Sequence, residues 1–286
     1  MKQTVILTSV CALMAVTQAR AQIITAWTFE NDPVAVNNSP APSTGSGTAG
    51  SLGMNLYPTP NVGVTTDDVL AGKASDTGAN GVANTTQTWR VRAQAGSTGT
   101  ANGWSSLAPI GTQGAEFAAS TAGYNNINIS FDWYATTQGE GNLQLAYTTD
   151  GINWINAPLT LSGSDTGLQV VSYNGADGLT VNGSYVRDNV LLNGALAGQN
   201  WFTGLTATIT DPNAANDPNF AIEMVNASTG TDCVSTQGTA LNNSSGNWRF
   251  DNVVIRGTVI GVPEPTALFL VSGSLAMLTA LRRRQL

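Results

Sequence analysis

Histidine is absent from this 286-residue chain. Without an imidazole the chain cannot build a Ser-His-Asp or Cys-His catalytic site, a histidine-ligated zinc site or the usual near-neutral general base. Cysteine is nearly absent too, with only Cys11 and Cys233. Because Cys11 lies in a segment that we expect to be removed, Cys233 is predicted to form no intrachain disulfide. No cationic residue stands close to Cys233 in the sequence, so we expect an unreactive thiol.

Charged residues are also scarce, at 10% of the chain against about 25% in typical domains. Asn, Thr, Ser, Gly and Ala take their place, which is typical of an exported β-protein with neutral polar strand faces. Between Gln22 and Gly261, six basic residues stand against seventeen acidic ones, a net charge near −11. Such a surface repels the phosphates of nucleic acids and anionic lipids, so we expect no nucleic-acid partner.

No segment of useful length between Gln22 and Gly261 has the period of a helix, whereas alternation of apolar and polar residues is common. Asn126–Thr137, for example, places Ile127, Ile129, Phe131 and Trp133 on one face. The other predicted strands are Ile23–Glu30, Gln87–Ala93, Glu116–Ala119, Asn142–Thr149, Gly167–Tyr173, Tyr185–Leu192, Leu205–Thr210, Phe220–Val225 and Trp248–Ile260. About ten strands with one apolar face each predict that residues 22–260 form an all-β, jelly-roll-like antiparallel β-sandwich, with a closed barrel as the alternative.

The connections contain turn-forming residues. Asp150-Gly151 predicts a two-residue hairpin between Leu143–Thr149 and Ile152–Trp154. The segment Thr148–Trp154 resembles the Asp-box hairpin of sialidases, but it is one residue shorter and occurs once, which favours a simple hairpin with a packed Trp. Asn37–Gly50 is predicted to be a loop. The repeated Asp-Pro-Asn of residues 211–219 is interpreted as turn-forming rather than metal-binding.

The N-terminus has the three parts of a signal peptide. Lys2 supplies the positive charge, Val5–Val16 is the apolar region, and Ala19-Arg20-Ala21 fits a cleavage site. We therefore predict a signal peptide over residues 1–21, with signal peptidase as a partner that recognises Ala19 and Ala21. The apolar run of about twelve residues is too short to span a membrane.

The C-terminus, residues 261–286, also has three parts. Pro263-Glu264-Pro265 is followed by an uncharged stretch, Thr266–Leu281, and then by Arg282, Arg283 and Arg284. The stretch predicts a single hydrophobic helix of about 24 Å, slightly shorter than the roughly 30 Å hydrocarbon core. The arginines would stay in the cytoplasm. From these residues alone, a permanent membrane anchor is an open alternative.

This tail resembles the PEP-CTERM sorting signal of bacterial exported proteins, with all three parts in order. The resemblance implies that an exosortase-like membrane enzyme recognises the tail and removes it near Pro263-Glu264-Pro265. It implies a membrane-anchored precursor and a mature form at the cell surface or in the extracellular matrix. Segments such as Ile129–Trp133, Leu145–Trp154 and Trp248–Val253 resemble, more loosely, the sandwich domains common in such proteins, which implies no defined activity.

Two further sites are predicted in the body. Glu30 and Asp251 resemble the acidic pair on the first and last strands of jelly-roll carbohydrate-binding modules, which implies a structural Ca²⁺; the alternative is two surface carboxylates. Trp27, Trp89, Trp133 and Trp248 fall on apolar strand faces and are assigned to the core. Trp104 and Trp201, together with Tyr124 and Tyr173, lie in less regular segments and are the candidates for stacking on sugar rings.

The leading functional interpretation is a non-catalytic structural or adhesive protein of the cell surface or extracellular polysaccharide. The first alternative is a carbohydrate-binding, lectin-like module. The second is a polysaccharide hydrolase built on two of Glu116, Glu140 and Glu223. No motif in the sequence groups these carboxylates, so we expect no enzymatic activity.

Overall fold

The computed structural model describes residues 20–30, 32, 35–36, 38–53, 63–66, 87–92, 104–136, 138–161, 168–172, 184–188, 201–233, 235, 241–243 and 246–261. The chain divides into two compact units, and Ala21–Ile260 is the one that contains the strands. The sorting tail and all of the signal peptide before Arg20 lie outside the described residues, as does Tyr173. Within the described residues, no helix is long and apolar enough to cross a membrane.

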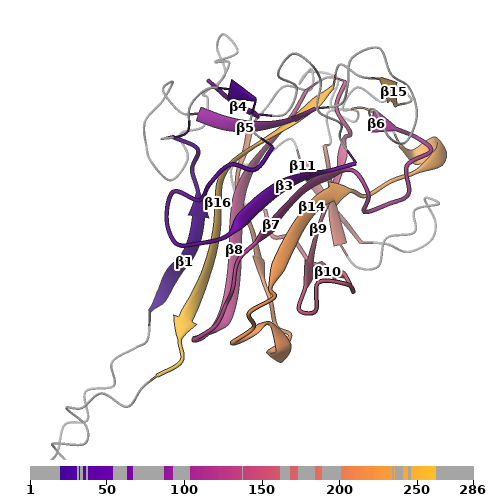
Figure 1. Cartoon of the computed structure of the whole chain (residues 1–286). Helices are drawn as coiled ribbons and strands as arrows, with labels where there is room; N and C mark the ends of the chain where they lie inside the picture. Colours follow the sequence, from indigo (N-terminus) through magenta and orange to yellow (C-terminus); the bar gives the residue numbers. More distant parts are fainter. Residues whose placement is uncertain are drawn as a thin grey trace, which may run out of the picture. The chain divides into compact units, whose positions relative to one another are not determined.

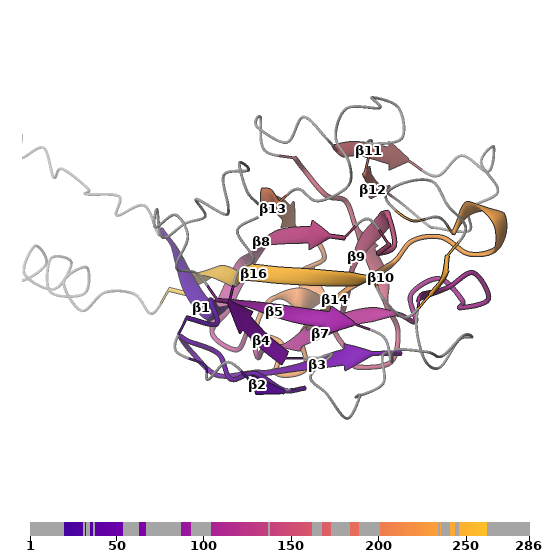
Figure 2. The same ribbon diagram turned by 90° about the horizontal axis from the view of Figure 1, so that it is seen from above.

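Two seven-stranded antiparallel sheets make up the unit (Figure 1). We call the first sheet A. Its strands, in spatial order, are β13 (Trp201–Thr208), β8 (Tyr124–Ala135), β16 (Asn247–Val259), β5 (Gln87–Arg92), β4 (Gly63–Thr66) and β2 (Ala35–Val36), with β1 (Ala21–Trp27) also paired to β16. Figure 2 shows β1 and β5 one after the other along the same edge of β16. The first and last strands of the unit are thus neighbours.

We call the second sheet B. Its order is β11 (Leu168–Ser172), β12 (Ser184–Asp188), β9 (Asn142–Thr148), β14 (Ala221–Asn226), β7 (Gly114–Ala118) and β3 (Thr48–Leu52), with β10 (Ile155–Ala157) also paired to β9. A two-stranded ribbon joins β6 (Trp104–Ser105) to β15 (Asn242–Asn243). Two short 3₁₀ helices, η1 (Pro212–Ala214) and η2 (Gly230–Asp232), complete the described elements.

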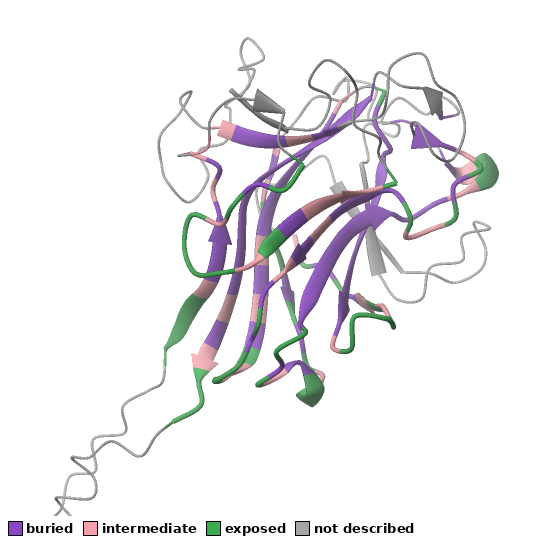
Figure 3. Ribbon diagram, in the orientation of Figure 1, coloured by how far each residue is buried: buried purple, intermediate pink, exposed green. Residues whose placement is uncertain are grey.

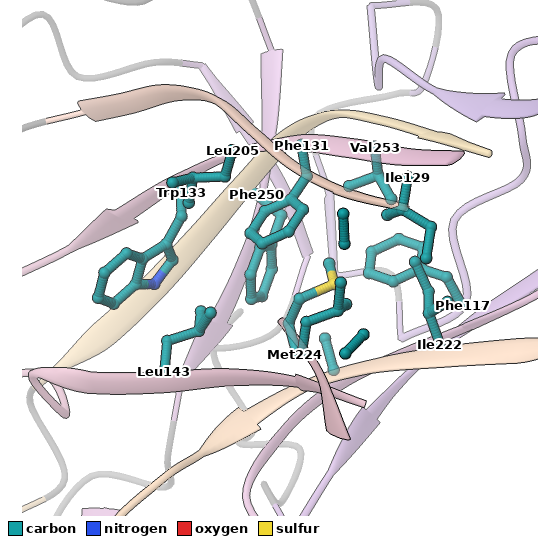
Figure 4. Packing of buried hydrophobic residues seen from close by; sticks show 14 of the residues in the cluster. Phe117, Ile129, Phe131, Trp133, Leu143, Leu205, Ile222, Met224, Phe250 and Val253 are labelled. Atoms are coloured by element: carbon teal, nitrogen blue, oxygen red, sulfur yellow. The ribbon is translucent and has the colours of Figure 1, made fainter. Parts of the chain in front are cut away.

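The core lies between the two sheets. In Figure 4, Phe131 and Phe250 of sheet A point toward Leu143 and Met224 of sheet B. Phe117 of β7 makes edge-to-face contacts with aromatic rings of sheet A, with ring centroids 5.1 Å from Trp27, 5.5 Å from Trp89 and 6.2 Å from Phe250. Such contacts add to the large area that each ring buries. The predicted antiparallel β-sandwich and the core assignment of the four tryptophans are therefore confirmed.

The ten strands predicted from alternation all occur, with ends that differ by a few residues. The sequence missed the short strands and β3, whose residues Thr48–Gly50 were expected to be loop. Thr48-Ala49-Gly50-Ser51-Leu52 has little apolar alternation, and it is a strand because it pairs with β7 at the edge of sheet B. Only the tertiary pairing distinguishes it from a loop.

The predicted two-residue hairpin at Asp150-Gly151 is wrong. β9 ends at Thr148 and β10 begins at Ile155, so six residues connect them. The Asp150 side chain organises this longer loop: Oδ1 accepts hydrogen bonds from the amides of Ile152 (2.8 Å) and Asn153 (2.7 Å). An aspartate that bonds its own following backbone competes with a tight two-residue turn. These bonds stabilise the ionised form, and they hold the pKa of Asp150 below its ordinary value.

Candidate functional site

The outer face of sheet A has a row of cation and aromatic side chains. Because opposite residues in paired strands share a face, Trp201 of β13, Tyr134 of β8, Arg249 of β16 and Arg90 of β5 stand directly beside one another. The rings of Trp201 and Tyr134 are 5.4 Å apart at a tilt of 38°. The Arg249 guanidinium lies 5.2 Å from the centre of the Tyr134 ring. We call Trp201, Tyr134 and Arg249 the aromatic row.

Exposure differs along the aromatic row. Tyr134 is 3% exposed and Arg249 is 5% exposed, whereas Trp201 at the end of the row is half-buried. A cation against an aromatic face is attracted to it, and more strongly when water is excluded. The contact between Tyr134 and Arg249 therefore holds the Tyr134 ring in place, and the Trp201 ring packs against that ring. Trp201, a predicted candidate for stacking on sugar rings, is accessible enough for that role, and the stacking itself stays a prediction.

The corresponding prediction for Trp104 is wrong. Trp104 is 1% exposed, and its ring packs 4.5 Å from that of Trp248. Its indole Nε1 donates a hydrogen bond to the carbonyl of Gly246 at 3.1 Å. A fully buried tryptophan with a satisfied donor belongs to the core. The sequence could not show this because Gly246 is 142 residues away along the chain.

Beside the row, Asp132 connects two β-bulges. The register of β13 shifts between Phe202 and Leu205, and that of β16 shifts between Asp251 and Val254. Asp132 Oδ1 accepts from the amide of Gly204 at 2.6 Å, and Oδ2 accepts from Asn252 Nδ2 at 2.8 Å. Gly204 and Asn252 both have positive φ, which suits bulge positions.

One of the two predicted calcium residues, Asp251, lies directly opposite Asp132. Asp251 is buried in β16, and its two carboxylate oxygens accept from the amide (2.7 Å) and the side chain (3.1 Å) of Asn252. Glu30 follows β1, and its Oε2 accepts from the amide of Gln87 at 3.4 Å. In the part of the chain that the structure describes, no three acidic or cysteine side chains are grouped to hold a metal ion. The calcium site stays a prediction.

On the outer face of sheet B, two carboxylates meet. Glu223 of β14 is directly opposite Glu116 of β7. Burial, and second the negative charge of Glu116, raise the pKa of Glu223 to about 8, and burial also raises the pKa of Glu116. We call these two residues the glutamate pair. Our expectation that no carboxylates are grouped was therefore incomplete. Both positions were predicted to be in strands, but the register that aligns them is a tertiary property.

The third glutamate, Glu140, lies in the protein interior. It is fully buried, and it accepts hydrogen bonds from Ser228 Oγ (2.7 Å), Cys233 Sγ (2.9 Å) and the side chain and amide of Asn142 (3.0 and 3.2 Å). Burial raises the pKa of Glu140 to about 7, against the lowering effect of these donors. Burial and the nearby Glu140 carboxylate also raise the pKa of the Cys233 thiol, in line with the predicted unreactive cysteine.

No protein-family model and no curated protein matches this chain. Among solved structures, a carbohydrate-binding module studied for specific mannan recognition, TmCBM27, aligns at 9% identity and TM-score 0.33 over 84% of this chain and all of that one. The N-terminal cellulose-binding domain of β-1,4-glucanase C from Cellulomonas fimi aligns at 12% identity and TM-score 0.28, covering 70% of this chain and 96% of its own. At such low values, neither alignment carries an argument about what this chain binds.

Proposed function

We propose that the chain is an exported protein whose jelly-roll-like β-sandwich binds polysaccharide through the outer face of sheet A. The observation that carries the proposal is the aromatic row: a partly exposed Trp201 ring continues the buried Tyr134–Arg249 pair. A rigid aromatic surface covers the apolar face of a sugar ring at a low entropic cost, since few torsions are immobilised.

Beside the row, Asp132 and Asn252 are buried, at 3% and 5% exposure, and are hydrogen-bonded to each other across the two strands. They hold the surface in shape rather than contact a sugar. A rigid and largely apolar surface is part of the usual composition of a ligand site. This arrangement favours sugar binding over a purely structural body, for which nothing requires a partly exposed tryptophan at the end of such a row.

The test compares two partly exposed tryptophans. Trp201→Ala is expected to weaken retention in affinity electrophoresis on gels that contain soluble β-mannan or hydroxyethylcellulose by about tenfold, because about 1–2 kcal/mol of stacking is lost. Trp154→Ala is the matched control, since Trp154 is half-buried in the loop between β9 and β10, away from the row. Equal retention of wild type and Trp201→Ala, or no retention of wild type on any polysaccharide gel, contradicts the proposal.

We also infer that this body is delivered by its two termini: the signal peptide starts export, and an exosortase-like enzyme removes the PEP-CTERM tail. The support is the order of Pro263-Glu264-Pro265, the apolar stretch and the three arginines. The test is the intact mass and cell fraction of the native protein beside a variant with Pro263, Glu264 and Pro265 replaced by Ala. A mass that starts at Gln22 and stops near Pro263, with the variant held in the membrane, is the expected result. A native mass that still includes Leu286 would make the tail a permanent anchor.

A further inference from the structure

Within the described part of the chain, neither carboxyl of the glutamate pair has a hydrogen-bond partner. Glu223 is 7% exposed, and no hydrogen-bond donor from the described residues reaches it. The side chain as a whole is mostly buried, but its carboxylate oxygens are not fully enclosed, so water or a ligand can reach them. Here the neighbouring group across the strands is a second carboxyl, Glu116, which is partly exposed.

The residues around the pair are small and uncharged. In the row across sheet B, Ala146 of β9 is opposite Glu223, and Gly50 of β3 is opposite Glu116. A Cβ atom added at Gly50 would meet nothing within 4 Å, so the space above this end of the row is open. Along β14, the neighbours on the same face are Ala221 and Val225. Open space is therefore found at the Gly50 end of the row, beside Glu116, whereas the residues around Glu223 are buried.

No other charge compensates the pair from the adjoining strands. β3 contains no titratable residue, and Tyr147, which is the titratable residue of β9, packs in the core. Within β7 and β14 themselves, Glu116 and Glu223 are the only ionisable side chains. Like charges directly opposite in a sheet repel each other. Among the adjoining strands β3, β7, β9 and β14, the pair is therefore an acidic site without a compensating cation.

We propose that Glu116 and Glu223 together bind a calcium ion on the outer face of sheet B, separate from the aromatic row and from the predicted Glu30 and Asp251 site. Calcium suits the site because it accepts six to eight oxygens in flexible geometry, and two carboxylates supply up to four while water fills the rest. With so few protein ligands, the dissociation constant is expected to be on the order of 10⁻⁴–10⁻³ M, the range of extracellular modules.

Binding must release the proton that the pair holds, so affinity should depend on pH. Isothermal titration of CaCl₂ into the purified protein is expected to show affinity at least about tenfold higher at about pH 9 than at about pH 6, because Glu223 is largely ionised only at the higher pH. Glu223→Gln and Glu116→Gln should each abolish this binding. Neither variant should unfold, since each removes a repulsion and keeps the side-chain shape, and far-UV circular dichroism checks this.

Glu30→Gln is the matched control, because it removes a carboxylate from the other predicted calcium site. It should leave the pH-dependent binding unchanged. Three results would overturn the proposal: no calcium binding at either pH, binding that persists in both folded glutamine variants, or loss of binding in Glu30→Gln alone. The experiment measures calcium binding and contains no polysaccharide. A negative result would therefore leave the proposed sugar binding unaffected.

Discussion

The outer faces of the two sheets show opposite ways of arranging polar residues on the same kind of scaffold. On sheet A, the side chains are paired: Arg249 lies against Tyr134, and both oxygens of Asp132 accept hydrogen bonds. On sheet B, Glu116 and Glu223 stand opposite each other, and no described residue donates a hydrogen bond to either. Figure 3 shows that both β9 and β14 are buried along their lengths, whereas β7, which carries Glu116, is only partly buried.

Cross-strand register can either satisfy charged side chains or place like charges together. Sheet A has bulges in β13 and β16, which turn backbone and side-chain donors toward Asp132. The β7–β14 pair is regular, with no register shift, so nothing turns a donor toward Glu223. Polar groups that are satisfied stabilise the fold, whereas an unsatisfied pair makes stability depend on protons or on a ligand.

The largest expected effect is a fall in the free energy of unfolding as pH rises, caused by Glu140 and Glu223. The pKa values of Glu140 (about 7) and Glu223 (about 8) exceed the value of 4.5 for an exposed glutamate. Between pH 4.5 and these values, the folded state therefore binds more protons than the unfolded state. The free energy of unfolding is highest below about pH 4.5, and it falls as the pH rises toward 7 and 8. Glu140 alone should lower the free energy of unfolding by about 3 kcal/mol by neutral pH.

Urea unfolding of the calcium-free protein at a series of pH values measures this slope. Glu140→Gln should flatten the curve up to about pH 7, and Glu223→Gln should flatten it up to about pH 8. The two variants separate the interior glutamate from the glutamate pair. A wild-type curve that rises between these pH values would contradict both assignments.

The second effect is on sheet A. Asp132→Ala removes the acceptor for Gly204 and Asn252, and it should lower the free energy of unfolding by about 2–3 kcal/mol, because two hydrogen bonds to a buried, charged acceptor are lost. Glu116→Ala on the opposite face is the matched control, and it should change stability by less than about 1 kcal/mol, since it removes no hydrogen bond. Urea unfolding at one pH measures both. Similar losses in the two variants would abolish the contrast between the faces.

The smallest expected effect is a change in the pKa of Glu223 when its neighbour Glu116 loses its charge. Glu116→Gln removes one negative charge beside Glu223, so the pKa of Glu223 should fall below about 8. The fall should be roughly one pH unit or less, because burial is the larger cause and remains. Titration of the Glu223 side-chain carboxyl by NMR measures it. An unchanged pKa would mean that the two carboxyls do not interact.

Local sequence patterns predicted much of the fold and only part of the sites. Alternation in Asn126–Thr137 predicted β8 and its buried face, because period two follows from the pleat itself. It could not predict β3, whose residues have no such alternation. Trp104 and Trp201 both lie in segments without regular alternation, so the sequence treats them alike. In the structure, Trp104 packs on Trp248 in the core, whereas Trp201 is half-buried. Such contacts join residues far apart in the chain, which no local pattern records.

The sequence by itself determined the class of the protein. The missing histidine excludes whole types of catalysis, the termini predict export and sorting, and the alternation predicts an all-β body, since each of these depends only on composition or on neighbouring residues. The tertiary structure alone decided which polar residues meet. Register placed Trp201 beside Tyr134, and Glu116 opposite Glu223. Because a shift of one residue moves every side chain to the other face of a sheet, the sites exist only in the folded alignment of the strands.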